Sequence, residues 1–153
     1  MIKTDLVFNF ENPDDSPGYL LAQLTLLWQR KQKKVLDPLD LTSTQFALMA
    51  AVGWLAKQSE NVTQIDIATQ TNFDRMMVSK VLRTLEAKKI VSRQPHKTDT
   101  RAKTIELTKD GSTILQKAIV AVEKADKDFF SFIDDGLFSF NAKMAILIKE
   151  NKG

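Results

Sequence analysis

Residues 62–108 read VTQIDIATQTNFDRMMVSKVLRTLEAKKIVSRQPHKTDTRAKTIELT, and this stretch decides how the chain is expected to fold. It contains two runs with the spacing of short helices, and Thr63 and Asp74 stand before them as residues suited to a helix start. Asp66 follows three residues after Thr63, where a carboxylate interacts favourably with the free N–H groups of a helix N-terminus. Because Asn72 tolerates a left-handed backbone, the pattern predicts a tight turn between the two helices.

The second of these helices has two different faces. Apolar residues recur at helical spacing and indicate a buried stripe, which consists of Val78, Val81, Leu82 and Leu85. The opposite face is basic and polar, and it carries Arg75, Met76, Ser79, Lys80 and Arg83. In an isolated helix, a solvated surface would be the favoured interpretation of such a face. After a capped turn, the same face is typical of a helix that contacts DNA.

Beyond the second helix, the pattern changes from helical spacing to alternation. Ile90-Val91 and residues 102–108 favour strands, and in the second run Ile105 and Leu107 alternate with polar neighbours, among them Thr104. Residues 95–101 are too polar for a core and are expected to form the tip of a hairpin. The sequence therefore predicts a helix-turn-helix followed by a two-stranded wing. The second helix would enter a DNA major groove, and the wing would reach the backbone or the minor groove.

Nine side chains of this helix and wing are candidate DNA contacts: Arg75, Met76, Ser79, Lys80, Arg83, His96, Lys97, Asp99 and Arg101. Arginine can bind guanine with two hydrogen bonds, whereas serine and lysine more often hold phosphate. Met76 is suited to touch a thymine methyl group, and His96 and Lys97 are candidate phosphate contacts. Arg101 is expected to enter the minor groove. Asp99 would orient Arg101, since an exposed ion pair contributes little to folding stability.

Helices are also expected before this stretch. Residues 16–17 are Ser-Pro, a cap followed by a first-turn proline. The helix that they begin should end near Leu36, because Asp37 precedes a proline and should leave the helical region. Thr42, with a glutamine three residues later, has the spacing of a capping box and begins the next helix.

The two ends of the chain carry more apolar residues than small helices need. A broad stripe in the first helix contains Leu20, Leu24, Leu27 and Trp28, and five of the nine Phe residues lie between Phe129 and Phe140. After the wing, a helix is expected from 109 to about 133, then a turn at 134–136 and a last helix over about 139–149. A core role would explain part of this surface. The excess predicts a homodimer built from the terminal helices.

One domain of the α+β class, mainly α with a small β-wing, is expected for the 153 residues. The winged helix-turn-helix lobe would occupy about residues 38–108. The dimerisation helices would occupy about 16–36 and 109–151. Residues 1–15 would form an N-terminal arm, in which a short extended segment ends at the Asn-Pro-Asp-Asp sequence of 12–15.

Charge and composition narrow the classes of function. The net charge is +3, but residues 62–103 alone hold nine Lys/Arg and four Asp/Glu, a balance of +5. Basic charge is therefore concentrated where DNA contact is predicted. The chain has no Cys, one His and no Gly-rich phosphate loop, so neither an enzyme nor a metal or cofactor site is expected. No long apolar run and no signal peptide pattern occur, which favours a cytoplasmic protein without a membrane span.

Three groups of residues resemble the multiple-antibiotic-resistance regulator (MarR) family of bacterial winged-helix repressors. They are Leu41-Thr42-x-x-Gln45-Phe46-Ala47-Leu48, then Ile67-Ala68 through Leu85-Glu86-x-Lys88-x-Ile90-Val91, and last Asp99-x-Arg101 followed by Leu107-Thr108-x-x-Gly111. With the flanking helices, the resemblance spans roughly residues 17–150.

The resemblance implies a homodimer with interlocked N- and C-terminal helices that binds a pseudo-palindromic operator on double-stranded DNA and commonly represses nearby genes. It also implies release of DNA on binding a small aromatic or phenolic effector, often an anion, between the dimer helices and the DNA-binding lobe. A winged-helix module that binds proteins rather than DNA stays open as the alternative. Steep salt dependence of duplex binding would separate the two.

Two positions depart from the family pattern. Lys89 stands where glycine is common, which implies either a helix end without a left-handed residue or a lysine held in that conformation. Thr100 stands where a second arginine is frequent, so the wing tip has less positive charge. The absence of Cys excludes the cysteine-based peroxide sensing of some members.

Overall fold

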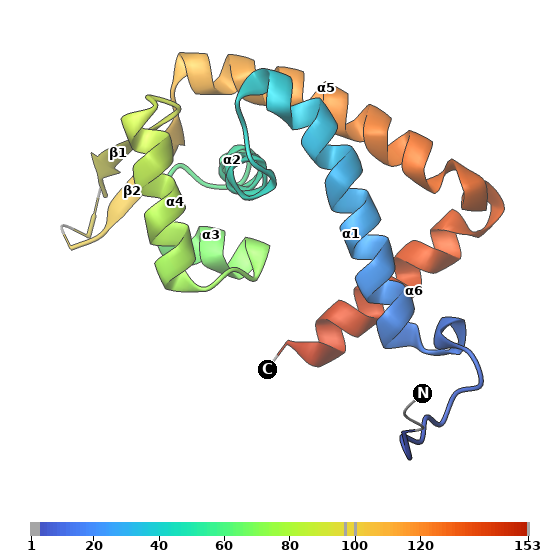
Figure 1. Ribbon diagram of the computed structural model, residues 1–153. Helices are drawn as coiled ribbons and strands as arrows, with labels where there is room; N and C mark the ends of the chain where they lie inside the picture. Colours follow the sequence, from blue (N-terminus) through green and yellow to red (C-terminus); the bar gives the residue numbers. More distant parts are fainter. Residues whose placement is uncertain (1–3, 97, 100, 153) are drawn as a thin grey trace.

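The computed structural model describes residues 4–96, 98–99 and 101–152, and within them helices predominate over a single small sheet (Figure 1). The elements in chain order are η1 Pro13–Asp15, α1 Pro17–Leu36, η2 Asp37–Leu39, α2 Ser43–Leu55, α3 Gln64–Thr71, α4 Arg75–Ala87, β1 Val91–Pro95, β2 Lys103–Leu107, α5 Lys109–Phe130, η3 Ser131–Gly136 and α6 Leu137–Asn151. The predicted class, mainly α with a small β-wing, is confirmed. Helices α2, α3 and α4 and the two strands form one lobe, from which α5 leads away toward α6.

Helices α3 and α4 begin at the residues predicted from the sequence. Thr63 and Asp66 form a reciprocal pair, in which the backbone N–H of Thr63 donates to the Asp66 carboxylate at 2.9 Å. Asp74 Oδ1 accepts from the Met77 N–H at 2.8 Å and so caps α4. Asn72 has φ 60°, the left-handed conformation that the turn requires. These contacts determine where α3 and α4 begin and where the chain turns between them.

The core of the lobe lies where α2, α3, α4 and the strands meet. Its fully buried side chains include Leu48, Met49, Ile67, Val78, Leu82 and Leu85. The apolar stripe predicted for α4 therefore faces inward, and the polar face of the same helix is left toward solvent.

The wing has an extra partner that the alternation pattern did not indicate. Strands β1 and β2 pair antiparallel, with Val91 opposite Leu107. The segment before α3 lies along the other edge of β2, because the N–H of Ile105 donates to the Val62 carbonyl at 2.8 Å. Thr104 is consequently only 3 % exposed, although the alternation had placed it on the polar side. This expectation was wrong because residues 62–63, distant in sequence, pair with the free edge of β2 beside Thr104.

Helix α4 ends with a lysine in the left-handed conformation. Lys88 still has φ −79°, but Lys89 has φ 61°, so of the two possibilities for this position the lysine adopts the glycine-like geometry. The N–H of Ile90 then donates to the Leu85 carbonyl at 2.9 Å, which closes the end of the helix. A non-glycine residue in this conformation carries backbone strain.

Replacing this lysine should relieve the strain. We expect Lys89→Gly to raise the free energy of unfolding by about 0.5–1 kcal/mol, since the relieved strain exceeds the extra freedom of glycine in the unfolded chain. Ala87→Gly, at an exposed position in the last turn of α4, should have the opposite sign because glycine gains freedom there and relieves no strain. Urea denaturation of both variants measures the difference. A Lys89→Gly protein less stable than the parent would contradict the argument.

Helix α1 ends at the expected residue, but the backbone after it is not the one that the proline was expected to impose. The helix does end at Leu36, but Asp37 keeps helical angles, φ −53° and ψ −44°, although a proline follows. The chain continues through η2 and reverses only at Asp40, which has φ 54°. Lys88, directly after α4, contacts this turn, because its Nζ donates to the Asp40 carbonyl at 2.7 Å. Asp37 itself pairs with Lys33 one helical turn earlier, at 2.7 Å, and it stays helical against the usual bias of a residue before proline.

The first turn of α5 packs closely against Lys89 and Ile90, the two residues that lead from α4 into β1. Thr108 Oγ1 donates to the Lys89 carbonyl at 2.7 Å and accepts from the Gly111 N–H at 2.9 Å. A Cβ atom at Gly111 would overlap the Ile90 carbonyl oxygen and lie 2.9 Å from the carbonyl carbon. The Leu-Thr-x-x-Gly sequence therefore has a packing reason, because only glycine lets α5 approach Ile90 this closely.

The C-terminal part bends earlier than expected. Helix α5 stops at Phe130 rather than near residue 133, and Ile133, with φ −125°, interrupts the helical path. Residues 131–136 form η3, and α6 begins at Leu137. None of the residues in α6 is buried, although the helix contains Phe138, Ile146, Leu147 and Ile148.

Candidate DNA-binding interface

One exposed face of α4 brings together all five helix residues predicted to contact DNA. Arg75, Met76, Ser79, Lys80 and Arg83 line a shallow surface hollow of about 570 Å³, together with Met77. Met76 is 84 % exposed, whereas Val78 on the opposite face is completely buried. Because Asp74 caps the helix directly before Arg75, this face starts at the first turn of α4. The face is exposed and basic, as a helix that enters a major groove requires.

The cations of this face are not taken up by ion pairs. Among the described residues, neither Arg75 nor Lys80 forms a salt bridge. Arg83 lies back along the helix, and its Nε donates weakly to the Ser79 carbonyl at 3.4 Å. The guanidinium and ammonium groups thus keep their hydrogen-bonding capacity for another molecule, and base edges or phosphates match that capacity.

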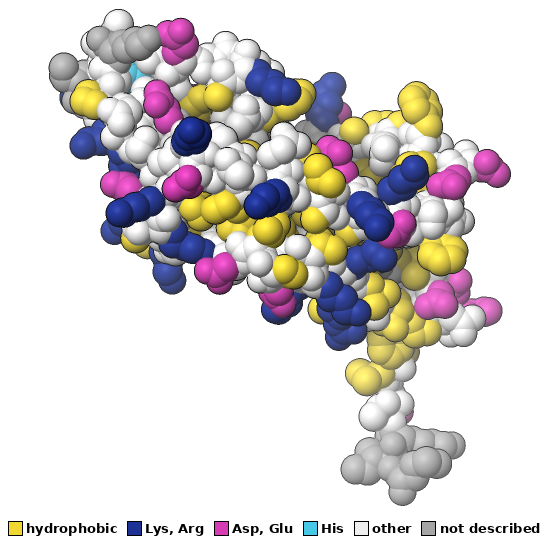
Figure 2. Space-filling model, turned by 90° about the horizontal axis from the view of Figure 1, so that it is seen from above, with side chains coloured by type: hydrophobic (Ala, Val, Ile, Leu, Met, Phe, Trp, Pro, Cys, Tyr) yellow, Lys and Arg dark blue, Asp and Glu magenta, His cyan; other side chains and the backbone are white. Residues whose placement is uncertain are grey.

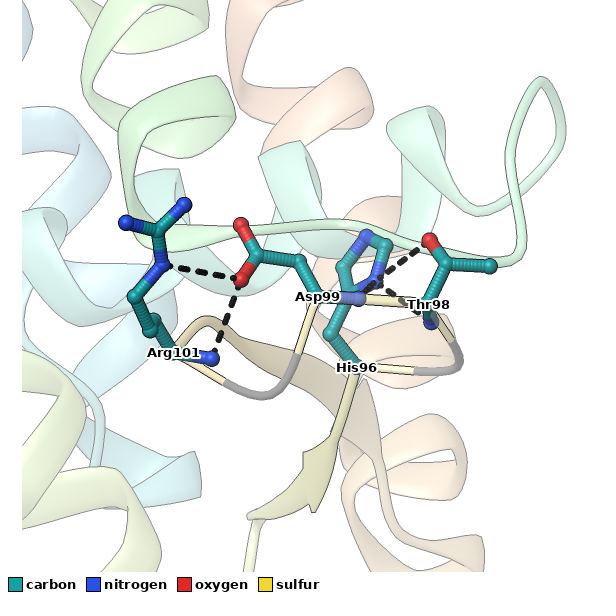
Figure 3. A network of polar contacts seen from close by, with 4 residues as sticks. All are labelled: His96, Thr98, Asp99 and Arg101. Carbon is teal, nitrogen blue, oxygen red and sulfur yellow. Dashed lines mark hydrogen bonds and ion pairs between the residues drawn. The ribbon is translucent and has the colours of Figure 1, made fainter.

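The tip of the wing is organised by His96 (Figure 3). Its Nδ1 accepts from the N–H groups of Thr98 at 3.1 Å and Asp99 at 3.0 Å. In the neutral ring this assigns the proton to Nε2, which remains as a donor. His96 was predicted only as a phosphate contact. In the structure it also serves as the acceptor that closes the hairpin tip.

Asp99 and Arg101 lie together at the same tip, as the sequence suggested. Asp99 Oδ1 accepts from the Arg101 N–H at 3.0 Å and from Arg101 Nε at 3.5 Å (Figure 3). The Arg101 side chain is 92 % exposed. Asp99 therefore holds the base of a guanidinium group whose terminal nitrogens project away from the wing. Lys97, also predicted as a contact, and Thr100 lie outside the described residues.

Arg93 is a residue that the sequence reasoning missed. From β1 its Nε donates to Glu86 of α4 at 2.8 Å, and its Nη1 reaches Gln64 of α3 at 3.5 Å. The side chain joins the wing to both helices of the helix-turn-helix, so it fixes where the wing stands relative to α4. The seven-residue separation of Glu86 and Arg93 becomes a contact only because the chain reverses at Lys89. Strand and helix patterns considered separately give no sign of it.

Comparison with known proteins identifies the family. The family model described as "MarR family" matches residues 41–103, which include α2, the helix-turn-helix and the wing as far as the first residue of β2. A curated relative from Bacillus subtilis (strain 168), named uncharacterized HTH-type transcriptional regulator YdcH, is 40 % identical over 122 residues, which cover 80 % of this chain and 83 % of the relative. The chain belongs to the MarR family. It is thus a DNA-binding transcriptional regulator with a winged helix-turn-helix.

Solved structures of other MarR-like regulators share this fold. CouR from Rhodococcus jostii RHA1, solved with p-coumaroyl-CoA, has a TM-score of 0.80 and 22 % identity, covering 94 % of this chain and 99 % of CouR. The MepR–DNA complex from S. aureus has a TM-score of 0.79 and 24 % identity, covering 88 % of this chain and 98 % of MepR. Along the described residues of this MarR-family protein, no helix combines the length and apolar character needed to cross a membrane.

Proposed function

We propose that this regulator is a ligand-responsive repressor that binds a pseudo-palindromic operator as a homodimer. The observation that carries the proposal is the exposed basic face of α4, capped at its first turn and joined through Arg93 to a wing with an outward Arg101. The α4 face would read bases in the major groove, with arginine on guanine and Met76 on a thymine methyl group. The wing tip, with His96, Asp99 and Arg101, would hold the backbone and the minor groove.

The homodimer is supported by apolar surface that the chain does not cover by itself. Phe132 is 93 % and Phe138 89 % exposed, and Leu21 of α1 is 63 % exposed. A hollow of about 490 Å³ lies between α1 and the turn into α6, and Phe129, Phe130 and Phe140 are among its walls. Figure 2 shows that hydrophobic side chains also lie exposed between the basic ones on one face of the molecule. A second copy could cover these surfaces with an interface upward of about 2,000 Å².

The symmetry of the bound site tests the function directly. Two α4 helices of a dimer should enter successive major grooves about 34 Å apart, or roughly 10 base pairs between half-site centres. Genomic fragments selected by the protein and then footprinted should show two symmetric half-sites, and light scattering should give twice the mass of one chain. Protection of an isolated half-site by one subunit would contradict the dimeric arrangement.

The same selection tests the alternative of a protein-binding winged helix. Specific operator binding should fall steeply with rising salt, because the cations of α4 and the wing displace ions from phosphates. If no fragment were enriched and the remaining binding were weak and insensitive to sequence, the protein-interaction interpretation would replace the repressor. The selected fragments would also indicate the regulated genes.

The ligand-responsive part of the proposal concerns a small aromatic effector. The likeness to CouR, which was solved with p-coumaroyl-CoA, supports a ligand site in a protein of this fold. Addition of the effector should lower operator affinity, because a ligand can shift the equilibrium only by binding the DNA-free state more tightly.

A further inference from the structure

A second hollow lies between α2 and α5, with β2 at one side. It has a volume of about 540 Å³, enough for a molecule with one or two rings. Phe46 and Trp54 of α2 supply aromatic walls, and Leu115, Ile119 and Val122 of α5 supply aliphatic ones. The hollow therefore joins a helix of the DNA-binding lobe to the long helix that leaves it.

The charged groups around this hollow are mainly acidic. Glu123 and Asp126 of α5 both line it, and Lys57 is the one cationic side chain among its lining residues. Neither carboxylate forms an ion pair with another described residue. Lys57 lies instead over the Trp54 ring, with its Nζ 5.5 Å from the ring centroid. The lining thus has a formal balance of −1, from two carboxylates and one ammonium group.

The occupied ring face shows what kind of group this surface accepts. Trp54 already attracts a cation, because the face of an indole ring carries negative electrostatic potential. Asp126 keeps one carboxylate oxygen for a ligand, since among the described residues only its Oδ1 is engaged, by Trp28 Nε1 at 2.7 Å. An anion placed here would be repelled by two carboxylates. A cation would be attracted by both carboxylates and by the face of the indole ring.

We propose that the hollow between α2 and α5 binds a small aromatic cation, such as an aryl amine or a quaternary ammonium compound. This inference rests on the ligand-responsive function proposed above and specifies the charge of its effector. The aromatic part of the ligand lies against Phe46 and the aliphatic side chains of α5. Its cationic group lies near Glu123 and Asp126 and takes the place of Lys57 over Trp54. An aromatic anion is disfavoured at the same site.

The position of Asp126 explains how a ligand in this hollow would affect the arrangement of the helices. Through Trp28, Asp126 ties α5 to α1, and α2 on the other wall packs in the core of the DNA-binding lobe. A cation that competes for Asp126 or spreads α2 from α5 changes the angle between these parts. The distance between two α4 helices in a dimer depends on that angle.

Two probes of equal size and opposite charge test the inference. Calorimetric titration of the full-length protein with 1-naphthylmethylammonium and with 1-naphthoate should give tighter binding of the cation. Glu123→Gln should weaken the cation roughly fivefold and strengthen naphthoate, as loss of one partly exposed charge contact would do. Asp126→Asn should act in the same direction, because the amide oxygen can still accept from Trp28 while the charge is lost. Glu150→Gln, the same substitution at the end of α6, should change neither affinity.

The outcomes separate this inference from the function on which it rests. If naphthoate bound as tightly as the cation, or if Glu123→Gln and Glu150→Gln behaved alike, the proposed charge preference would be overturned. Operator release by naphthoate in the same samples would then leave the ligand-responsive repressor intact. If neither probe bound, the site itself would be overturned. Operator affinity of the ligand-free protein, measured in parallel, reports on DNA binding independently of both probes.

Discussion

Gly111→Ala is expected to lower the free energy of unfolding by about 3 kcal/mol, the largest effect of an alanine at any of the four described glycines. The new Cβ would overlap the Ile90 carbonyl oxygen, and both groups are backbone-bound, so no side-chain rotation relieves the contact. Either α5 must move away from Ile90, or the Thr108 hydrogen bonds to the Lys89 and Ile90 carbonyls must break. Chemical denaturation with circular dichroism detection measures the loss.

Gly18→Ala is the matched control for this substitution. Gly18 also lies in the first turn of a helix, but a Cβ there meets nothing within 4 Å. Alanine at this position should be neutral or stabilise by up to about 1 kcal/mol, because it has the higher helix propensity. Equal midpoints for Gly111→Ala and the parent protein would show that the start of α5 is not held against Ile90.

Arg75→Ala and Arg101→Ala should affect DNA binding in different ways, and these are the largest effects expected at the interface. Arg75 lies on the α4 face, so Arg75→Ala should weaken binding to the true operator by about 1–3 kcal/mol and binding to random duplex far less. Arg101 lies on the wing, so Arg101→Ala should weaken binding to both duplexes and reduce by about one unit the slope of log affinity against log salt concentration. Affinity measured against salt concentration on the two duplexes distinguishes base reading from backbone holding.

Two further variants serve as references for that comparison. Asp99→Ala should resemble a milder Arg101→Ala, because the guanidinium group loses its orienting partner at 3.5 Å but keeps its charge. Arg30→Ala removes an exposed arginine from α1, away from α4 and the wing, and should leave the salt slope unchanged. If Arg101→Ala kept full affinity for both duplexes while the protein stayed folded, the assigned wing contact would be wrong.

Features determined by neighbouring residues could be predicted from the sequence. The caps at Thr63 and Asp74 and the left-handed Asn72 depend on contacts within three residues, so the order of helix, turn and helix was correct. The outward face of α4 followed from helical periodicity once its buried stripe was identified. The expected conformation of Asp37 was wrong, because this residue stays helical before the proline and pairs with Lys33 one turn earlier.

Features that join distant segments could not be predicted in this way. Arg93 meets Glu86 and Gln64 only after the reversal at Lys89 has placed β1 beside the two helices. The buried Thr104 depends on Val62, and the hollow beside Trp54 depends on how α5 crosses α2. Each requires the relative positions of elements, which neither spacing nor composition contains.

If the wing tip contacts DNA as proposed, the hydrogen bonds at His96 also lower the free-energy cost of binding. A hairpin tip without internal contacts would have to be ordered when it meets the DNA, and each rotamer-rich side chain fixed in this way costs about 0.5–1.5 kcal/mol. Here the imidazole already holds the N–H groups of Thr98 and Asp99, and Asp99 already holds Arg101. These four residues of the tip are thus preorganised in the free protein. Loss of the imidazole would weaken binding through conformational entropy even where every positive charge of the wing was retained.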